Sequence, residues 1–406
     1  MKQPRPYPVY AVTPKAERSL TAGHPWVYGE EIIREPEVTP ENGALVDVVS
    51  RRGSYLGTGL LSLHSKIRIR LLSRSANDRF DEAFWRRRLE YAWAYRRTVM
   101  GPEDLDCCRI VFGEADQLPG LTVDRFHDIL VTQTMSYGME LRKDVIFPAL
   151  AEVLRADGQE IRGIYERNDV PLREREGLEE GKGWYRLPGE EPPAETRTLI
   201  RENGVAYEVD FENGQKTGFF LDQKYNRAAA ARIAPGKSVL DCFTHTGSFG
   251  LNCAKAGAKR VHSVDVSETA IACAKENAAR NGLSVEYEVA NVFDLLPSLT
   301  PGEYDYIILD PPAFTKSGKT VKNAERGYKE INYRAMKALP RGGYLATCSC
   351  SHFMTDALFR KMLQSAASDA QVELRLVEAR AQGPDHPVLW NVPETDYLKF
   401  YIFQVV

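Results

Sequence analysis

The chain has 406 residues, of which 43% are hydrophobic and 27% are charged, ordinary values for a globular protein of two to four domains. Its 30 glycines and 23 prolines exclude collagen-like and low-complexity sequence, and no run of 18 apolar residues is present to form a transmembrane helix. The seven cysteines lack the spacing of a disulfide framework, which predicts reduced thiols and a cytoplasmic location.

The charge is unevenly distributed along the chain. The formal net charge is −3, yet residues 51–97 contain 12 Lys and Arg against 4 Asp and Glu. Such an excess indicates a basic face for the phosphates of a nucleic acid, and the alternative is a solvated helix face.

Residues 1–73 are expected to form a small β-barrel. Strands are predicted at 45–49, 55–61 and 67–71. The last of these alternates apolar and basic residues, which is typical of a half-buried strand. We therefore expect Arg68 and Arg70 on the exposed face of the barrel, where they would bind substrate.

Residues 74–192 are expected to form a small α+β domain. The hydrophobic pattern predicts helices at 81–99 and 141–155, and strands at 108–112, 121–125, 129–134 and 163–166. The polar stretch at 177–193 is interpreted as a linker or a hairpin.

Residues 193–406 alternate strands and helices, which is typical of a doubly wound, Rossmann-like α/β sheet. Strands are predicted at 238–242, 260–265, 285–290, 304–309, 343–350, 372–379 and 399–405. The helices are expected to start at Ser248, at Ser267 as an N-cap residue, near Lys322 and at Thr355.

The loop after the first of these strands is the expected cofactor site, because ligands of such sheets bind at the carboxyl ends of the strands. Asp241 would repel a pyrophosphate there, and the following segment, which includes Phe243 and Gly247, is not the GxGxxG loop of dinucleotide-binding proteins. A cofactor with a cationic amine and a sulfonium fits better. S-adenosylmethionine (SAM) has both.

Polar residues end the next two strands as well. The carboxylate of Asp265 could accept hydrogen bonds from ribose hydroxyls, and the amide of Asn291 could pair with an adenine edge. A lone acidic residue at a strand end is usually a cap, but three polar strand ends together favour a SAM site.

The fourth strand ends in Asp310, followed by Pro311 and Pro312. The prolines fix the backbone as it leaves the sheet, and Asp310 is then expected to face the cofactor methyl group. Pro311, Pro312 and Phe314 are candidate substrate contacts. The alternative is a strand-terminating turn with a capping aspartate.

The fifth strand ends in an unusually polar segment that contains Cys348 and Cys350. With a period of two, both cysteines point to one face, and Cys350 lies nearer the carboxyl end. Its thiolate could add to C6 of a pyrimidine and make C5 nucleophilic. The alternatives are a small buried hydrophobic residue or a metal site with His352, for which no fourth ligand lies at usable spacing.

Six motifs, in order along nearly the whole chain, resemble the SAM-dependent large-ribosomal-subunit RNA methyltransferases that carry an amino-terminal PUA domain. They are HPWV at 24–27, NGQKTGFFLDQK at 213–224, the loop at 241–249, DPP at 310–312, SCS at 349–351 and DHPV at 385–388. Each motif is weak alone, but the ordered set is specific.

The resemblance implies a cytosine-C5 methyltransferase that acts on large-subunit ribosomal RNA. Asp241, Phe243, Gly247, Asp265, Asn291 and Asp310 would then hold SAM, and Lys216 and Gln223 would line its entrance. Asp310 would orient or protonate the target base, and Cys350 would be the nucleophile. The second cysteine of two-cysteine RNA C5 methyltransferases has no counterpart after the fourth strand. Apolar residues at the edge of the middle domain would permit a homodimer.

Two other functions fit parts of the pattern. One is methylation of an exocyclic amine of guanine or adenine in RNA, although such enzymes often place an aromatic residue directly after Asp-Pro-Pro, and here Ala313 stands there. The other is a non-catalytic RNA-binding assembly factor, which would have no need of the Asp241, Asp310 and Cys350 set.

Overall fold

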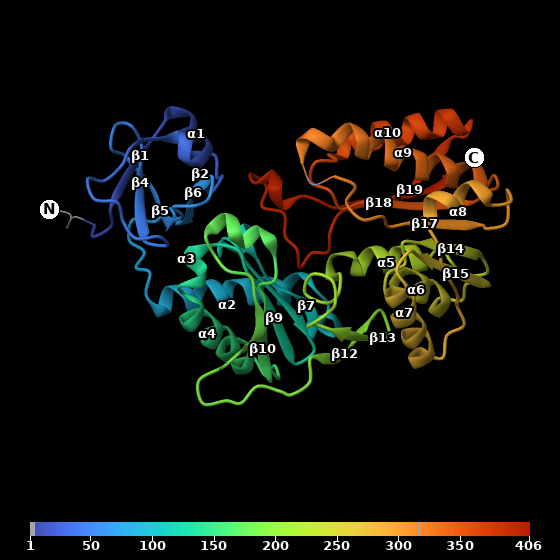
Figure 1. The fold of residues 1–406 in the computed structure, drawn as a ribbon, viewed down its shortest axis with the longest axis horizontal. Helices are drawn as coiled ribbons and strands as arrows, with labels where there is room; N and C mark the ends of the chain where they lie inside the picture. Colours follow the sequence, from blue (N-terminus) through green and yellow to red (C-terminus); the bar gives the residue numbers. More distant parts are fainter. Residues whose placement is uncertain (1–4, 316) are drawn as a thin grey trace. The chain divides into compact units, whose positions relative to one another are not determined.

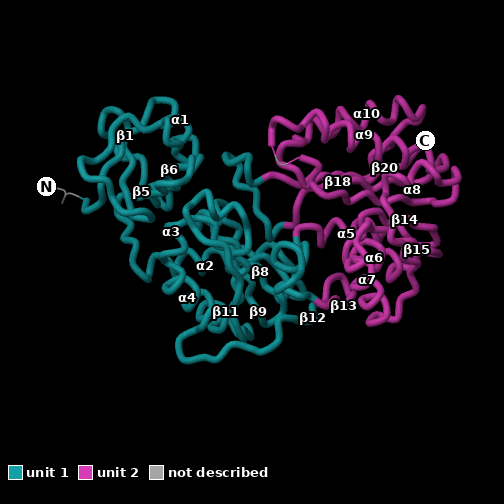
Figure 2. The backbone as a smooth tube through the Cα atoms, viewed as in Figure 1, with its two compact units in different colours: residues 1–200, 209–221, 384–395 teal, residues 201–208, 222–383, 396–406 magenta. Residues whose placement is uncertain are grey.

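The computed structural model describes residues 5–315 and 317–406, which form two compact units (Figure 2). Of the described residues, the first unit contains 5–200, 209–221 and 384–395, and the second contains 201–208, 222–315, 317–383 and 396–406. Among the described residues, no helix is long and apolar enough to cross a bilayer.

The amino-terminal part of the first unit is a six-stranded sheet with the strand order β2-β6-β5-β4-β1-β3 (Figure 1). Its strands are β1 (Val9–Val12), β2 (Trp26–Tyr28), β3 (Ile32–Arg34), β4 (Leu45–Val49), β5 (Tyr55–Leu61) and β6 (Ile67–Ser73). Helix α1 (Pro14–Thr21) begins after Thr13, whose side chain accepts from the Ala16 amide. Val12, Val27 and Ile69 are buried in the shared core.

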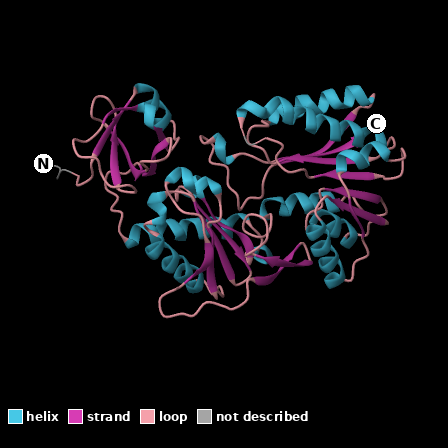
Figure 3. Cartoon of the chain, in the orientation of Figure 1, coloured by secondary structure: helices cyan, strands magenta, loops and turns pink. Residues whose placement is uncertain are grey.

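The rest of the first unit is built on a five-stranded sheet with the order β11-β10-β9-β8-β7. Its elements are α2 (Glu82–Val99), β7 (Cys107–Phe112), β8 (Leu121–Phe126), β9 (Ile129–Thr134), α3 (Tyr137–Glu140), α4 (Lys143–Ala156), β10 (Gly163–Arg167) and β11 (Lys182–Tyr185). Helices α2 and α4 pack on this sheet through Phe84, Trp85 and Phe147 (Figures 1 and 3). The α+β prediction is confirmed, and the polar stretch at 177–193 contains strand β11.

The second unit is a seven-stranded sheet with the order β16-β15-β14-β17-β18-β20-β19. Strands β16, β15, β14, β17 and β18 are parallel, and β20 runs antiparallel to both of its neighbours. The strands are β14 (Ser238–Cys242), β15 (Arg260–Asp265), β16 (Glu286–Val289), β17 (Tyr306–Leu309), β18 (Tyr344–Ser349), β19 (Leu374–Arg380) and β20 (Lys399–Val405). The doubly wound α/β prediction is confirmed.

Helices cover both faces of this sheet (Figures 1 and 3). They are α5 (Lys224–Ala231), α6 (Ser248–Lys255), α7 (Glu268–Asn281), α8 (Val292–Ser298), α9 (Val321–Ala338) and α10 (Asp356–Ala370). One core joins α8, α9 and α10 to the sheet, and another joins α5 and α6 to its opposite face. Because the chain turns from β14 outward to β15 and β16 and then returns to β17, the carboxyl ends of β14 and β17 flank a switch point, where ligands bind in such sheets.

A two-stranded sheet of β12 (Arg197–Glu202) and β13 (Val205–Asp210) precedes the large sheet and was not predicted. Its turn is Asn203-Gly204, with φ of 51° and 78°. Positive φ at both central residues is the conformation that a tight hairpin turn requires, and Asn-Gly is its strongest sequence signal.

Candidate active site at the carboxyl ends of the central strands

Asp241 is fully buried near the end of β14. Its Oδ2 accepts hydrogen bonds from Thr244 Oγ1 at 2.5 Å, from the Gly250 amide at 2.8 Å and from Ser263 Oγ at 3.3 Å. Its Oδ1 has no partner among the described residues. Burial raises the pKa of Asp241 to about 7, because the charged form loses its hydration.

The loop after β14 has an unusual backbone. Phe243, His245 and Gly247 have φ of 64°, 50° and 85°, and left-handed φ is uncommon for residues other than glycine. Backbone hydrogen bonds hold the loop, including one from the Thr244 amide to the Val264 carbonyl at 3.0 Å. Such strained segments cluster at ligand-binding sites.

Helix α6 approaches β14 and β15 very closely at Gly250. A Cβ atom at this position would lie 2.3 Å from Ser263 Oγ and 2.9 Å from Asp241 Oδ2. Only glycine therefore allows the Gly250 amide to reach the Asp241 carboxylate.

Asp265, the last residue of β15, is half-buried and connects two loops. Its Oδ2 accepts from the His245 amide and its Oδ1 from the Ser267 amide, both at 3.0 Å. Ser267 caps α7 by accepting from the Ala270 amide, as predicted. Each carboxylate oxygen of Asp265 has a second lone pair for a ligand hydroxyl.

Asn291 is the N-cap residue of α8. Its Oδ1 accepts from the Phe293 amide at 3.1 Å, and its Nδ2 donates to Asp294 Oδ2 at 3.0 Å. The side chain is thus already engaged by its own helix, and the expected contact with adenine stays a prediction.

Asp310, directly after β17, is the centre of a polar cluster. Its Oδ1 accepts from Cys348 Sγ at 2.9 Å and from Gln223 Nε2 at 3.1 Å. Burial raises the pKa of Asp310, and burial next to this carboxylate raises the pKa of Cys348 well above its usual value. Cys348 is therefore a neutral thiol that donates to a carboxylate.

Gln223 is a buried partner of Asp310. The resemblance places it at the entrance of the cofactor site, a role that stays a prediction, and 4% of the residue is exposed. Its Oε1 accepts from Asn226 Nδ2 at 2.7 Å while its Nε2 donates to Asp310. Gln223 therefore orients the Asp310 carboxylate from the buried side.

Cys350 is half-buried and lies one residue beyond the end of β18. Close to it is Lys399, a residue that the sequence analysis missed. Lys399 Nζ donates to the Ser351 carbonyl at 2.6 Å and to the Tyr397 carbonyl at 2.7 Å. Burial lowers the pKa of Lys399 to about 8, and nearby Asp396, Cys350 and Asp356 oppose this shift.

The segment after Asp310 packs partly inward. Pro311 is buried and Pro312 is exposed. The ring of Phe314 lies 4.6 Å from that of Tyr328 and 5.7 Å from that of Phe293, measured between centroids. Among the described residues, no group of three or more His, Cys, Asp and Glu side chains could hold a metal ion.

Two protein-family models match parts of this chain. Residues 181–403 match the model of S-adenosylmethionine-dependent methyltransferases, and residues 11–74 match a PUA-like domain. The chain belongs to the SAM-dependent methyltransferases. Its cofactor is therefore SAM, as the strand ends had indicated.

Curated relatives match this methyltransferase over nearly its full length. A protein of Shewanella denitrificans named ribosomal RNA large subunit methyltransferase I is 42% identical, over 97% of this chain and 98% of the relative. A protein of the same name from Photobacterium profundum is also 42% identical, over 94% and 96% of the two chains.

Solved structures share the fold of the methyltransferase. A SAM-dependent methyltransferase structure from Streptococcus mutans superposes with a TM-score of 0.80 at 23% identity, covering 98% of this chain and 100% of that chain. The structure of the methyltransferase SMU.776 complexed with SAH has a TM-score of 0.81, with the same identity and coverage.

The residues around the loop after β14 fit SAM. Asp241 Oδ1 and Thr246 Oγ1 are both buried without a partner among the described residues, and buried polar groups of this kind are rare unless a ligand or water satisfies them. A cationic amine would compensate the buried Asp241 carboxylate. We expect Asp241, Gly247 and Asp265 to hold the cofactor.

The expected substrate contacts of the first unit require a correction at Arg70. Arg68 is half-buried and donates to the Ser62 carbonyl at 2.9 Å. Arg70 is 8% exposed and forms an ion pair of 2.8 Å with Glu176. Arg70 was expected on a wet face, but a partner 106 residues away in the sequence neutralises it.

Lys216, which was expected at the cofactor entrance, belongs to the first unit. Its φ is 52°, and its Nζ lies 4.7 Å from the centroid of the Phe220 ring. Its predicted role at the entrance is untested.

Proposed function

We propose that this methyltransferase modifies C5 of a cytosine in large-subunit ribosomal RNA, with Cys350 as the nucleophile. The observation that carries the proposal is the half-buried thiol of Cys350 close to the cation of Lys399, just beyond the strand whose Cys348 binds Asp310. The names of the curated relatives support the choice of ribosomal RNA.

Cys350 attacks C6 of the cytosine as a thiolate, which makes C5 nucleophilic. SAM supplies the methyl group that C5 receives. The C5 proton is then lost and the Cys350–C6 bond breaks, which restores the aromatic ring. Because a thiol has an ordinary pKa of about 8.5, the reaction is faster if a cation stabilises the thiolate, and Lys399 is placed to do so.

Asp310 acts on the base from the end of β17. Burial raises the pKa of its carboxyl group above the usual value for aspartate. In this position Asp310 orients or protonates the target base as the thiolate adds to C6. Gln223 and Cys348 keep the Asp310 carboxyl group oriented for this role.

The target cytosine must leave its base stack before Cys350 can reach C6, because C6 is inaccessible within a duplex. The basic residues of the first unit would neutralise the RNA phosphates and supply most of the affinity.

Methylation of an exocyclic amine is the second candidate. Enzymes of that class stack the flipped base on an aromatic side chain after Asp-Pro-Pro. The nearest aromatic residue here, Phe314, is packed against Tyr328, which favours cytosine C5. The family match argues against the third alternative, a purely RNA-binding assembly factor.

The decisive experiment incubates the protein with SAM and unmodified large-subunit ribosomal RNA, digests the RNA to nucleosides and identifies them by mass spectrometry. Cys350→Ala is the test variant. Cys273→Ala is the matched control, because Cys273 is also a half-buried cysteine but lies on α7. We expect 5-methylcytidine from the wild type and the control, and none from Cys350→Ala.

A methylated purine, or equal amounts of product from wild type and Cys350→Ala, would instead establish the amine methyltransferase. If free RNA gives no product, the same assay on assembled large subunits distinguishes a particle-specific enzyme from a protein without this activity.

A further inference from the structure

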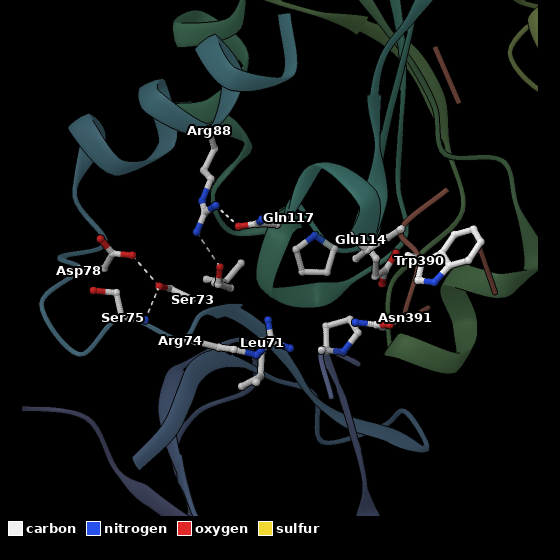
Figure 4. A pocket seen from close by; sticks show the side chains of 15 residues that line it. Leu71, Ser73, Arg74, Ser75, Asp78, Arg88, Glu114, Gln117, Trp390 and Asn391 are labelled. Atoms are coloured by element: carbon white, nitrogen blue, oxygen red, sulfur yellow. Dashed lines mark hydrogen bonds between the residues drawn. The ribbon is translucent and has the colours of Figure 1, made fainter. Parts of the chain in front are cut away.

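The first unit contains a cavity of about 480 Å³ that the proposed chemistry does not use. Its lining combines β6 and the residues after it, helix α2, the turn at 113–119 and the segment 389–391 (Figure 4). Arg74, Arg88, Gln117, Trp390 and Asn391 are among its lining residues. The volume is in the range of small-molecule and nucleotide pockets.

Two arginines of this cavity have no carboxylate partner. Arg88 donates to the Leu72 carbonyl at 2.9 Å and to the side chain of Gln117, and Arg74 donates to the Leu20 and His24 carbonyls, each at 3.3 Å. Neither forms an ion pair within the described part of the chain. Burial lowers the pKa of Arg88, and the nearby Asp78 opposes this shift without forming an ion pair with Arg88.

Two arginines next to Arg88 in the sequence, in contrast, form ion pairs with carboxylates. Arg86 lies 2.7 Å from Glu152 and Arg87 lies 3.3 Å from Asp78, both on the same helix as Arg88. Of the two carboxylates of the cavity, Asp78 is paired with Arg87 and also accepts from Ser73 Oγ at 2.5 Å. Glu114 accepts from the uncharged Trp26 Nε1 at 3.0 Å and keeps its charge. The two unpaired arginines therefore exceed the one unpaired carboxylate, which favours an anion.

Trp390 at the rim is 91% exposed. The segment that carries it is firmly anchored on both sides. Before it, Asp385 accepts from the Arg109 amide at 2.9 Å and its carbonyl accepts from Arg96 at 2.8 Å. After it, Val392 is fully buried. An indole that a well-anchored segment keeps in solvent is available to stack on a base.

We propose that this cavity binds one nucleotide of a single-stranded segment of the RNA substrate, with its phosphate held by Arg74 and Arg88 and its base stacked on Trp390. Guanidinium groups bind phosphate with paired hydrogen bonds, and aromatic side chains stack on every base. Asn391 and Gln117 add polar groups beside the base. The inference rests on the proposed function, because it takes RNA as the substrate.

The DHPV segment at 385–388 acquires a role in this arrangement. Asp385 and His386 are each 2% exposed, and the ring of His386 lies 5.5 Å from that of Phe112. These buried residues hold the following segment in place, so that Trp390 stays at the rim of the cavity.

The test is fluorescence polarisation with a fluorescein-labelled, 12-nucleotide single-stranded RNA of mixed sequence, titrated with the full-length protein at several salt concentrations. Trp390→Ala is expected to weaken binding roughly 5- to 150-fold, the range of base–aromatic stacking, and Trp390→Phe is expected to restore most of it. Thermal unfolding of Trp390→Ala should match the wild type, since the side chain is exposed.

Arg74→Gln and Arg88→Gln test the phosphate contact. Each is expected to weaken binding and to reduce the slope of log K against log salt by about 0.7, the value for one phosphate of a single strand. Arg86→Gln, on the same helix but already paired with Glu152, should bind like the wild type. Wild-type affinity in Trp390→Ala, or unchanged salt slopes in both arginine variants, would overturn the proposal.

The nucleoside assay separates this inference from the proposed function. If Trp390→Ala binds RNA weakly but the wild type makes no 5-methylcytidine, the cavity is supported and the cytosine-C5 activity is wrong. If the wild type makes 5-methylcytidine and Trp390→Ala binds normally, the activity is supported and the cavity is wrong.

Discussion

The thiol of Cys348 donates a hydrogen bond to the carboxylate of Asp310 across 2.9 Å. This contact gives Cys348 a structural task and supports the choice of Cys350, which the sequence already favours as the nucleophile. A buried thiol with a raised pKa that already serves a carboxylate is a poor nucleophile, whereas Cys350, half-buried beyond the strand end, is accessible to a substrate.

The first prediction concerns RNA that contains 5-fluorocytidine at the target. Fluorine cannot leave C5 as a proton does, so the covalent adduct should accumulate with the nucleophilic cysteine. We expect a slowly migrating protein–RNA band on a denaturing gel with wild type and with Cys348→Ala, and none with Cys350→Ala. A band from Cys350→Ala that Cys348→Ala lacks would reverse the assignment of the two thiols.

Cys348→Ala should also destabilise the protein. The variant removes a thiol donor from a buried carboxylate, a change that costs about 1–3 kcal/mol in the free energy of unfolding. Urea denaturation measures this cost independently of activity.

The second prediction concerns Lys399 and does not depend on RNA. Lys399→Met removes a buried cation near Cys350, so the pKa of the Cys350 thiol should rise and its alkylation by iodoacetamide at pH 7 should slow several-fold. Peptide mass spectrometry follows Cys350 alone, and Cys273 in the same digest is the internal control. Equal alkylation of Cys350 in wild type and variant would remove Lys399 from the mechanism.

The same lysine predicts the pH range of the effect. The pKa of Lys399 is lowered to about 8 in the fold, so its charge, and the help that it gives to the thiolate, is present below pH 8 and lost above it. The difference in alkylation rate between wild type and Lys399→Met should therefore shrink from pH 7 to pH 9.

The sequence predicts the second unit well because each strand of a parallel sheet is a short apolar run with a polar end. Asp241, Asp265 and Asp310 follow from that pattern alone. Lys399 does not, because a lysine before the apolar run of β20 looks exposed, and only the antiparallel pairing of Ser349 with Lys399 brings it to the end of β18.

In the first unit the sequence predicts the strands but not the contacts of their side chains. Strand alternation correctly predicts β6, but it gives no sign that Glu176 lies against Arg70, because the two residues are separated by most of the middle domain. The Asn203-Gly204 turn, in contrast, was visible in the sequence and was overlooked. The boundaries of the three domains and the homodimer stay predictions.

The third prediction concerns Arg70. Arg70→Ala would leave Glu176 buried without its partner, and breaking a buried ion pair in this way costs about 3–5 kcal/mol. Urea denaturation should show this loss, while the double variant Arg70→Met with Glu176→Leu should recover most of it. A variant Arg70→Ala that is as stable as the wild type but binds the 12-nucleotide RNA weakly would return Arg70 to the RNA-binding surface.

The fourth prediction concerns Asp241 and the pH dependence of SAM binding. The raised pKa of about 7 means that the folded protein without cofactor gains stability from a protonated Asp241 at low pH and loses that contribution as the pH rises through 7. The cationic amine of SAM is expected to bind only the ionised carboxylate of Asp241. SAM affinity should therefore be roughly eightfold weaker at pH 6 than at pH 7.5, in proportion to the ionised fraction.

Isothermal titration calorimetry between pH 6 and pH 7.5 measures this dependence. Asp241→Asn is the control, because the amide is similar in shape but does not ionise, and its weaker binding should vary little with pH. If wild-type affinity is constant across the range, Asp241 does not bind the amine, and its buried carboxylate serves only to join the loop at 243–247 to helix α6.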